Sequence, residues 1–364
     1  MRRDIAVGVA LVLGVLAACA ACGGAVDAPA VAFTPVIASV TVSPTIPAPT
    51  LEPITTLLFT GDIIPARCTD AAVNAHGGDW SVPFQALQPQ LAAADITIAT
   101  LDSTISEAVV PTGCIETFSL GGVAAVADAL KYAGYDVIAH AANHIKDCGA
   151  AACGDQAMLD TAVNLRAVGI QSVGSGANIV EARKPVVVEC NGVRFAFLAY
   201  DDIAAYYHAD ATHGGSAPMD PATVGEDIAA ARAIADVVII IPHWGIEYTA
   251  EPSERQRVFA RAAADAGADL VIGNHPHWVQ ANERIGETFV AYALGNFVFD
   301  QDWSLETQQG AMLEVKFAGT RVTGTTYFPV HIYDQYQPRL AVGDEAAAIL
   351  RRIEDASAAL VAAP

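Results

Sequence analysis

The segment Leu270-Val271-Ile272-Gly273-Asn274-His275-Pro276-His277 places two histidines directly after a short apolar run. An apolar run of this length predicts a buried strand, so both imidazoles would emerge at the carboxyl end of that strand. A second segment repeats the arrangement, because Val237-Val238-Ile239-Ile240-Ile241 is followed by Pro242-His243. Histidine is the commonest metal ligand in proteins, and α/β folds build their sites at strand ends. The pattern therefore predicts a metal centre, and the alternative is a pair of buried structural histidines at positions 275 and 277.

Apolar runs alternate with helical patterns on both sides of these segments, starting at Thr55, and this alternation predicts an α/β domain with largely buried strands. The predicted strands are Thr56–Thr60, Ile96–Leu101, Val137–His140, Val186–Glu189, Val193–Ala199, Val237–Ile241, Leu270–Ile272 and Phe289–Ala293. The predicted helices are Pro83–Ala93, Val123–Ala133, Gln156–Val168, Pro221–Ile234 and Ser253–Ala266. After Gly310 the pattern becomes strand-rich, and it predicts a hairpin made of Ala311–Phe317 and Arg321–Phe328.

Five of the predicted strands are followed closely by polar residues with metal-binding or acid–base chemistry. These residues are Asp62 and Arg67, Asp102, Asn143 and His144, His243, and His275 and His277. The carboxyl ends of strands in an α/β sheet converge on one crevice, so we expect these side chains to lie together. Two carboxylates, one amide oxygen and three imidazoles suit manganese, iron or zinc. This set exceeds the needs of one tetrahedral ion, so it predicts two divalent ions, which in such centres lie about 3.5–4 Å apart and clamp a phosphoryl group.

The overall composition narrows the classes of partner. The chain has 364 residues, 53% of them hydrophobic, and a formal net charge of −21. This length is sufficient for one domain of roughly 250–300 residues with a sizeable core. The negative charge would repel nucleic acid, so no nucleic-acid partner is expected, whereas divalent cations would be tolerated well. The sequence also lacks the glycine-rich loops of nucleotide kinases and dehydrogenases and the serine elbow of α/β hydrolases.

Residues 1–22 predict a lipoprotein signal peptide with its lipobox. Arg2-Arg3 precedes an apolar run, Ile5–Leu16, which is too short to cross a bilayer. The run ends in Leu16-Ala17-Ala18-Cys19, which resembles a bacterial lipobox, so a lipidated Cys19 is expected to anchor the exported protein to the outer face of the cell membrane. Cys22 is the second candidate, and a plain cleaved signal is the alternative. Residues 23–54 are rich in Ala, Val, Thr and Pro and predict an extended tether.

Five further cysteines follow the signal, and an exported protein can oxidise them. Cys148 and Cys153 are near enough in sequence to close a small loop, and Cys68 with Cys114 is the natural second pair. Cys190 would then remain free. Because no two of these five cysteines form a C-x-x-C pair, a zinc knuckle built from them is not expected.

Six motifs, taken in their order and spacing, resemble the CapA family, the capsule or poly-γ-glutamate synthesis proteins. They are GDIIPAR (61–67), ATLDSTIS (99–106), AANHIKDCG (141–149), PHWGIEY (242–248), GADLVIGNHPHWVQ (267–280) and ALGNFVFD (293–300). The fold of this family is similar to that of calcineurin-like metallophosphoesterases. The resemblance covers residues 55–335 and implies a four-layer α-β-β-α sandwich, in which two sheets pack face to face with helices outside. Residues 336–364 would form a C-terminal extension that is expected to be helical.

The resemblance also implies individual roles for the candidate residues. The implied metal ligands are Asp62 and His277 for the first ion, Asp102 as the bridge between the ions, and Asn143, His243 and His275 for the second ion. His144 is implied as the general acid, and Arg67 is implied as a clamp for phosphate oxygens.

Two positions depart from the pattern. Ile64 stands where the wider superfamily has a second ligand in its first motif, and Asp102 stands where the CapA pattern usually has the longer glutamate. We therefore expect the first ion to be weakly held or exchangeable. Glu247, four residues after His243, is either an acid that orients an imidazole or an ordinary surface acid.

The resemblance implies a metal-dependent phosphoric ester hydrolase that acts on cell-envelope or capsular material. The alternative is a non-catalytic component that assembles or transports the capsular polymer with the same fold. A third possibility, an extracellular binding module, would need none of the ligands at the strand ends.

Overall fold

The computed structural model describes residues 52–362 of the chain. The predicted signal peptide and lipobox (1–22), with Cys19 and Cys22, and all but the last three residues of the predicted tether (23–54) lie outside the described residues. Among the described residues, no helix combines the length and the apolar character of a membrane span.

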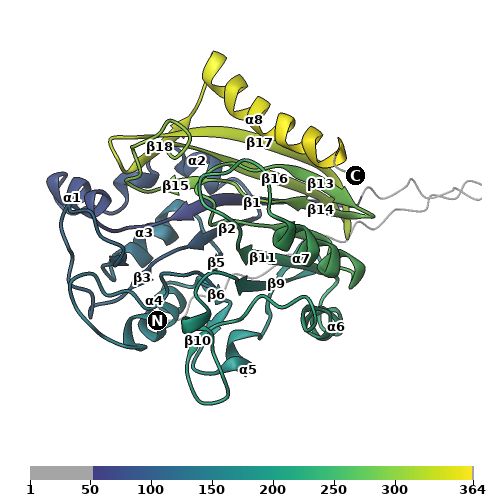
Figure 1. Ribbon diagram of the computed structural model, residues 1–364, viewed down its shortest axis with the longest axis horizontal. Helices are drawn as coiled ribbons and strands as arrows, with labels where there is room; N and C mark the ends of the chain where they lie inside the picture. Colours follow the sequence, from purple (N-terminus) through teal and green to yellow (C-terminus); the bar gives the residue numbers. More distant parts are fainter. Residues whose placement is uncertain (1–51, 363–364) are drawn as a thin grey trace, which may run out of the picture. The chain divides into compact units, whose positions relative to one another are not determined.

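The strands form two large sheets and two short pairs (Figure 1). The first sheet has the order β18 (Gln337–Leu340), β17 (Arg321–Tyr333), β16 (Gln309–Ala318), β1 (Ile54–Ile63), β2 (Ile96–Leu101), β5 (Val137–Ala139) and β6 (Gln171–Val173), with β15 (Asn296–Val298) also paired to β1. The second sheet has the order β13 (Asn282–Ile285), β14 (Thr288–Ala291), β12 (Leu270–Ile272), β11 (Val237–His243), β9 (Val193–Asp201) and β8 (Val186–Cys190). The short pairs are β3 (Thr104–Ile105) with β4 (Gly121–Gly122), and β7 (Ser175–Gly176) with β10 (Gly215–Ser216).

The two large sheets pack face to face, because alternate side chains of their strands point into one shared core. In β1, Leu57 and Phe59 face this inner core, whereas Leu58 faces the opposite side of the sheet. Phe195 of β9 meets Phe317 of β16 edge to face between the sheets, with ring centroids 5.4 Å apart. An aromatic pair of this geometry adds about 0.5–1.5 kcal/mol beyond the area that it buries.

Helices cover the outer face of each sheet. The helices are α1 (Cys68–Ala75), α2 (Gln88–Leu91), α3 (Val126–Ala133), α4 (Gln156–Ala167), α5 (Ile179–Ala182), α6 (Val224–Arg232), α7 (Glu254–Asp265) and α8 (Gly343–Ala362), with 3-10 turns η1 (Val82–Phe84) and η2 (Ala205–Tyr207). Apolar residues of α1 to α4 pack on the first sheet, and those of α6 and α7 pack on the second. The four-layer α-β-β-α sandwich implied by the resemblance is therefore confirmed.

Most of the predicted helices and strands are present in the structure, and one predicted helix is wrong. Ser253 caps α7 as expected and forms a reciprocal capping box with Gln256. The predicted helix Pro83–Ala93 is instead split into η1 and α2. Pro89 explains the break, because a proline inside a continuous helix removes a hydrogen bond and clashes with the preceding turn.

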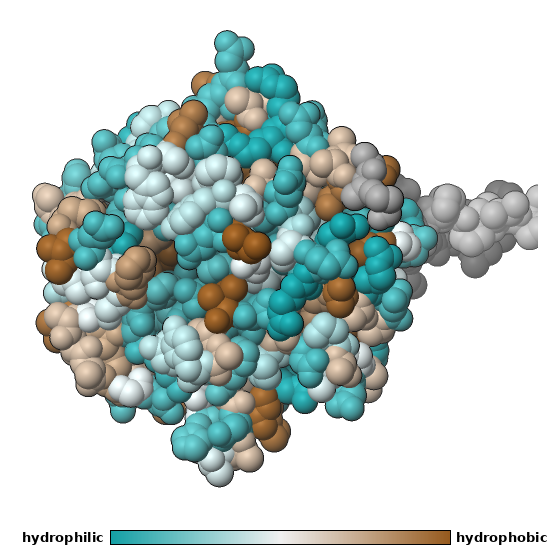
Figure 2. Space-filling model, in the orientation of Figure 1, coloured by the Kyte–Doolittle hydropathy of each residue, from teal (hydrophilic) through white to brown (hydrophobic). Residues whose placement is uncertain are grey.

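The C-terminal segment contains α8, which lies beside β17 in Figure 1. Ile349 and Ile353 of this helix are fully or almost fully buried and pack with Ala311 of β16. On the face of the molecule seen in Figure 2, hydrophobic residues form small separate patches on a mainly hydrophilic surface.

Disulfides join the two expected pairs, Cys68 with Cys114 and Cys148 with Cys153, and Cys190 is free within the part of the chain that the structure describes. The first bridge ties the start of α1 to the loop that follows β3.

Candidate metal centre

The six predicted ligands come from both sheets and meet at one edge of the sandwich. Asp62, Asp102 and Asn143 lie at or just after the ends of β1, β2 and β5 of the first sheet. His243 ends β11, and His275 and His277 follow β12 of the second sheet. The strands within each set are parallel, so their carboxyl ends are aligned. The site thus lies where the ends of two sheets face each other, rather than in the crevice of a single sheet.

His243 is the hub of the cluster. Its Nε2 atom lies 2.8 Å from Asn143 Oδ1, 3.2 Å from His275 Nδ1 and 3.6 Å from Asp102 Oδ1. Ligand atoms that share one ion at about 2.1 Å are themselves about 3.0–3.4 Å apart. The distances from His243 Nε2 to these three atoms are therefore close to those expected between donors of one ion, and the four residues are the set implied for the second ion together with its bridge.

Asp62 occupies the other side of the cluster. Its Oδ1 atom lies 3.8 Å from His243 Nδ1, and its Oδ2 atom lies 3.8 Å from His277 Nδ1. Oδ2 also accepts a hydrogen bond of 3.1 Å from the backbone N–H of His275. Asp62 and His277, the pair implied for the first ion, therefore lie close to each other.

Whether the cluster suits a cation can be judged from the buried polar atoms at its centre. Asp62 Oδ1, both carboxylate oxygens of Asp102 and His243 Nδ1 are buried without a hydrogen-bond partner within the described part of the chain. An unpaired buried polar atom costs about 1–3 kcal/mol, and more if it is charged. Native proteins rarely keep several such atoms together unless an ion or water satisfies them. Mixed oxygen and nitrogen donors of this kind suit divalent manganese, iron or zinc.

The acid–base state of the cluster follows from its burial. Burial and the neighbouring charge of Asp102 raise the pKa of Asp62 well above its usual value, and burial raises the pKa of Asp102 to about 7. Burial lowers the pKa of His277 to about 4 and holds those of His243 and His275 well below the usual value. The imidazoles are therefore neutral, with lone pairs free for a cation, and a cation would in turn favour the ionised carboxylates.

Two glycines allow the backbone segments to approach at this edge. A β-carbon on Gly61 would lie 1.9 Å from the carbonyl oxygen of Gly295, and one on Gly273 would lie 2.2 Å from Trp244 Nε1. The register of β1 against β2 also shifts between Phe59 and Asp62. Such an irregularity re-aims the residue that follows it, which here is Asp62.

Three residues beside the cluster have left-handed backbone angles. These are Tyr248 (φ 60°), His275 (φ 99°) and His277 (φ 58°). Such conformations cost about 1–3 kcal/mol each for residues other than glycine and cluster at functional sites. The strain sets the directions of the two imidazoles, which supports a role beyond packing.

His144 lies beside the cluster with one ring nitrogen fixed. Its Nδ1–H group donates a hydrogen bond to Asp147 Oδ2, with 2.6 Å between the two atoms. Burial lowers the pKa of His144, but the carboxylates of Asp102 and Asp147 outweigh it, so the pKa is raised above its usual value. Nε2 is thus the atom of His144 that can transfer a proton.

Arg67 is close to the centre but is held by protein groups. Its guanidinium pairs with both carboxylate oxygens of Asp300 and donates to the carbonyl oxygen of Thr117 at 2.9 Å. The guanidinium also lies over the ring of Phe299, 4.8 Å from its centroid, and this ring contacts His277. The phosphate-clamp role stays a prediction, and it requires Arg67 to exchange part of these contacts for the substrate.

Sequence reasoning gave no role to several residues that position the site. Asn296 Oδ1 lies 2.8 Å from His277 Nδ1, and the Asn296 amide donates to Gln301 and to the carbonyl of Thr307. The amide oxygen must therefore accept, so His277 carries its proton on Nδ1 and leaves Nε2 free. Asn274 joins the two sheets, because its amide donates to Thr100 Oγ1 at 2.8 Å. The only signal for Asn296 was its place in the motif at 293–300.

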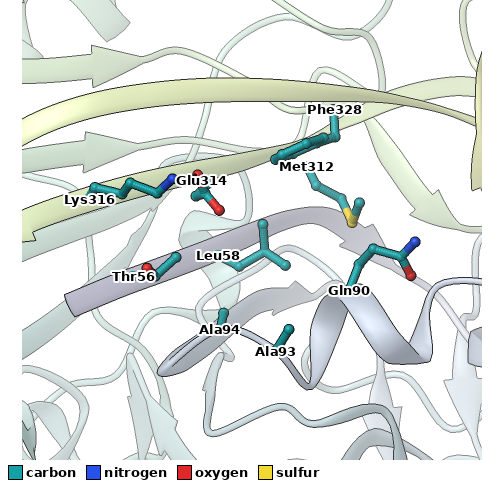
Figure 3. Close-up of a pocket in the computed structure, with 9 residues that line it drawn as sticks. All are labelled: Thr56, Leu58, Gln90, Ala93, Ala94, Met312, Glu314, Lys316 and Phe328. Carbon is teal, nitrogen blue, oxygen red and sulfur yellow. Dashed lines mark ion pairs between the residues drawn. The ribbon is translucent and has the colours of Figure 1, made fainter. Parts of the chain in front are cut away.

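A separate cavity of about 310 Å³ lies on the outer face of the first sheet (Figure 3). Leu58, Met312 and Phe328 line it together with Ala93 and Ala94. Its two charged residues, Glu314 and Lys316, neutralise each other at 2.9 Å. None of the predicted site residues lines this cavity.

Comparison with known proteins agrees with the motifs. The family model described as "Bacterial capsule synthesis protein PGA_cap" matches residues 56–301. The chain is 31% identical over 277 residues to the PGA biosynthesis protein CapA of Bacillus subtilis, covering 75% of this chain and 71% of that protein. It is also 31% identical over 266 residues to the capsule biosynthesis protein CapA of Bacillus anthracis, covering 71% of this chain and 63% of that protein.

Among solved structures, the chain is similar to the calcineurin-like phosphoesterase YfkN from Bacillus subtilis. That match has a TM-score of 0.41 and 12% sequence identity, and it covers 84% of this chain and 97% of that chain.

Proposed function

Since the chain belongs to the bacterial capsule synthesis (PGA_cap, or CapA) family, we propose that it is a metal-dependent phosphoric ester hydrolase acting on cell-envelope or capsular material. The observation that carries the proposal is the group of buried, unpartnered atoms on Asp62, Asp102 and His243 at the meeting point of the two sheets. A purely structural cluster would have paired these atoms with one another.

Within the proposal, the ligand set would hold two divalent ions, which are manganese, iron or zinc. Asn143, His243 and His275 would hold one ion, Asp62 and His277 would hold the other, and Asp102 would contribute to both. The bound ions would polarise the phosphoryl oxygens of a substrate as Lewis acids.

His144 then acts as the general acid of the reaction. Asp147 holds the Nδ1 side of its ring, so Nε2 delivers the proton to the leaving oxygen. Arg67 is the group that can bind phosphate oxygens when part of its pairing with Asp300 is given up.

The charge of the protein constrains the substrate. Poly-γ-glutamate is a polyanion, and a formal net charge of −21 repels it unless cations lie between them. We therefore propose an envelope substrate that carries a phosphoric ester, and we do not take the polymer itself as the substrate.

The proposed location is the outer face of the cell membrane, with lipidated Cys19 as the anchor. The basic start, short apolar run and Leu16-Ala17-Ala18-Cys19 support this proposal. Residues 23–54 would then separate the folded domain from the membrane.

Hydrolysis of an aryl phosphomonoester and an aryl phosphodiester with added Mn²⁺ tests the proposal. His144→Ala should lower turnover about 10²–10⁴-fold with metal content unchanged, whereas His243→Ala should also lower metal content. Elemental analysis of the purified proteins measures that content.

Equal metal loss in both variants would contradict the separate roles of His144 and His243. If the wild-type protein binds metal but hydrolyses neither ester, the alternative is favoured, namely a non-catalytic component that assembles or transports capsular polymer. The names of the two Bacillus relatives refer to biosynthesis, and this favours the alternative of a non-catalytic assembly or transport component.

A further inference from the structure

The first-ion side of the proposed centre has fewer ligands than the second. Position 64, where the wider superfamily has a ligand, is a fully buried isoleucine that packs with Ala66, Leu120 and Phe299. An aliphatic side chain cannot bind a cation. The first ion would therefore depend on Asp62, His277 and the bridging Asp102 unless another part of the chain supplies a donor.

Glu247 brings a carboxylate to this side. It lies in the loop between β11 and α7, and ligand atoms of Glu247, His275 and His277 all lie within 4.8 Å of one another. The two histidines are buried and Glu247 is exposed, so its carboxylate approaches them from the solvent side.

The chain around Glu247 is fixed against the histidine loop. The backbone N–H of Tyr248 donates to the carbonyl oxygen of Pro276 at 2.9 Å, and Pro276 separates the two histidines. The ring of Tyr248 stacks on that of His277, with centroids 6.1 Å apart and planes inclined by 26°. These contacts place Glu247 beside His277 independently of any charge on its side chain.

Two of the donors proposed for the first ion are in the state that a cation needs. His277 carries its proton on Nδ1, which donates to Asn296, so the lone pair of Nε2 is available. Asp62 Oδ1 is fully buried and has no hydrogen-bond partner within the described residues. Both facts indicate that Glu247 serves as a metal ligand, and does not merely lie near two imidazoles by chance.

Glu247 could instead act only through its charge, as a partner of His144. Asp147 is already the direct partner of His144, because Asp147 Oδ2 lies 2.6 Å from His144 Nδ1. Asp102 and Asp147 also contribute more than Glu247 to the raised pKa of His144.

We propose that Glu247 is a metal ligand of this centre, which closes the solvent side of the first ion beside His277 and replaces the ligand missing at position 64. This inference rests on the proposed metal centre. The first ion then has three carboxylates, Asp62, Asp102 and Glu247, and carboxylate-rich sites suit Mn²⁺ better than Zn²⁺.

Titration of the metal-stripped protein with Mn²⁺ tests the inference, with free Mn²⁺ followed by electron paramagnetic resonance. Glu247→Gln keeps the shape of the side chain but removes its charge, and we expect the weaker-held Mn²⁺ to lose at least about tenfold in affinity. Glu251→Gln is the matched control, because Glu251 is an exposed acid of the same loop. This variant should bind Mn²⁺ with the same affinity as the wild type.

The outcomes separate this inference from the proposed function. If wild type and Glu247→Gln bind Mn²⁺ with the same affinity, Glu247 is not a ligand while the metal centre stands. A changed pH profile of hydrolysis with unchanged affinity would likewise assign Glu247 to His144 and overturn the inference. If the wild-type protein binds no divalent metal, both the centre and the role of Glu247 are wrong.

Discussion

Asp102→Asn should stabilise the metal-free protein and weaken the stabilisation that metal provides. Asp102 is fully buried, and neither of its carboxylate oxygens has a hydrogen-bond partner within residues 52–362. Burial raises its pKa from 3.8 to about 7, so the folded protein holds this proton more tightly than the unfolded chain does. The free energy of unfolding of the metal-free protein therefore falls as the pH rises from about 4 to about 7, and the loss persists above that range.

The pKa difference gives the size of the effect. A shift from 3.8 to about 7 corresponds to a loss of about 4 kcal/mol at pH 8. Asparagine removes the charge but leaves an unpaired buried amide, which costs about 1–3 kcal/mol. The metal-free variant should thus be about 1–3 kcal/mol more stable than the wild type at pH 8.

Metal should narrow this difference. A cation at 100 times its dissociation constant stabilises the folded state by about 2.7 kcal/mol, and the variant lacks the charged ligand that lies between the two ion sites. Urea denaturation at pH 8 measures the free energy of unfolding, once with EDTA and once with Mn²⁺. Asp128→Asn, which removes an exposed carboxylate from α3, is the control and should change neither value.

Two results would refute this reasoning. One is a metal-free Asp102→Asn protein that is less stable than the wild type. The other is an equal gain from Mn²⁺ in both proteins, which would mean that Asp102 does not face a cation.

Two further predictions concern other parts of the chain. Burial lowers the pKa of His140 from 6.5 to about 4, so the unfolded chain takes up this proton first as the pH falls. Between pH 7.5 and 4.5, the free energy of unfolding should then drop by ~2.5 kcal/mol more in the wild type than in His140→Gln. Urea denaturation measures both drops, and equal drops would contradict the lowered pKa of His140. Cys19→Ala should move the protein from the membrane fraction to the soluble fraction of the producing cells, and unchanged fractionation would rule out Cys19 as the sole anchor.

Local patterns predicted the strands, the types of ligand and their places after strand ends. Leu270–Ile272 and Ile96–Leu101 were predicted with the bounds that the structure has, because short apolar runs between polar residues have few other ways to be buried. The helix Pro83–Ala93 was wrong, although the proline that breaks it was visible in the sequence.

Partners far apart in the chain could not be predicted from local patterns. Asn143 and His243 are separated by 100 residues, and Asp62 and His275 are separated by 213. The positions of these residues after strand ends and the family resemblance both suggested that they share a site, but neither gave a distance between them. Asn296, which fixes the tautomer of His277, was part of a quoted motif without a role.

Local sequence was sufficient to identify the donors that the protein carries and to place them at or near strand ends, because strand formation depends on neighbours within a few residues. Three features became visible only in the folded protein: the ends of two different sheets face each other, Arg67 is paired with Asp300, and Glu247 lies beside His275 and His277. The physical reason is that these contacts depend on how the two sheets pack through their shared core, and many side chains along the whole chain set that packing together.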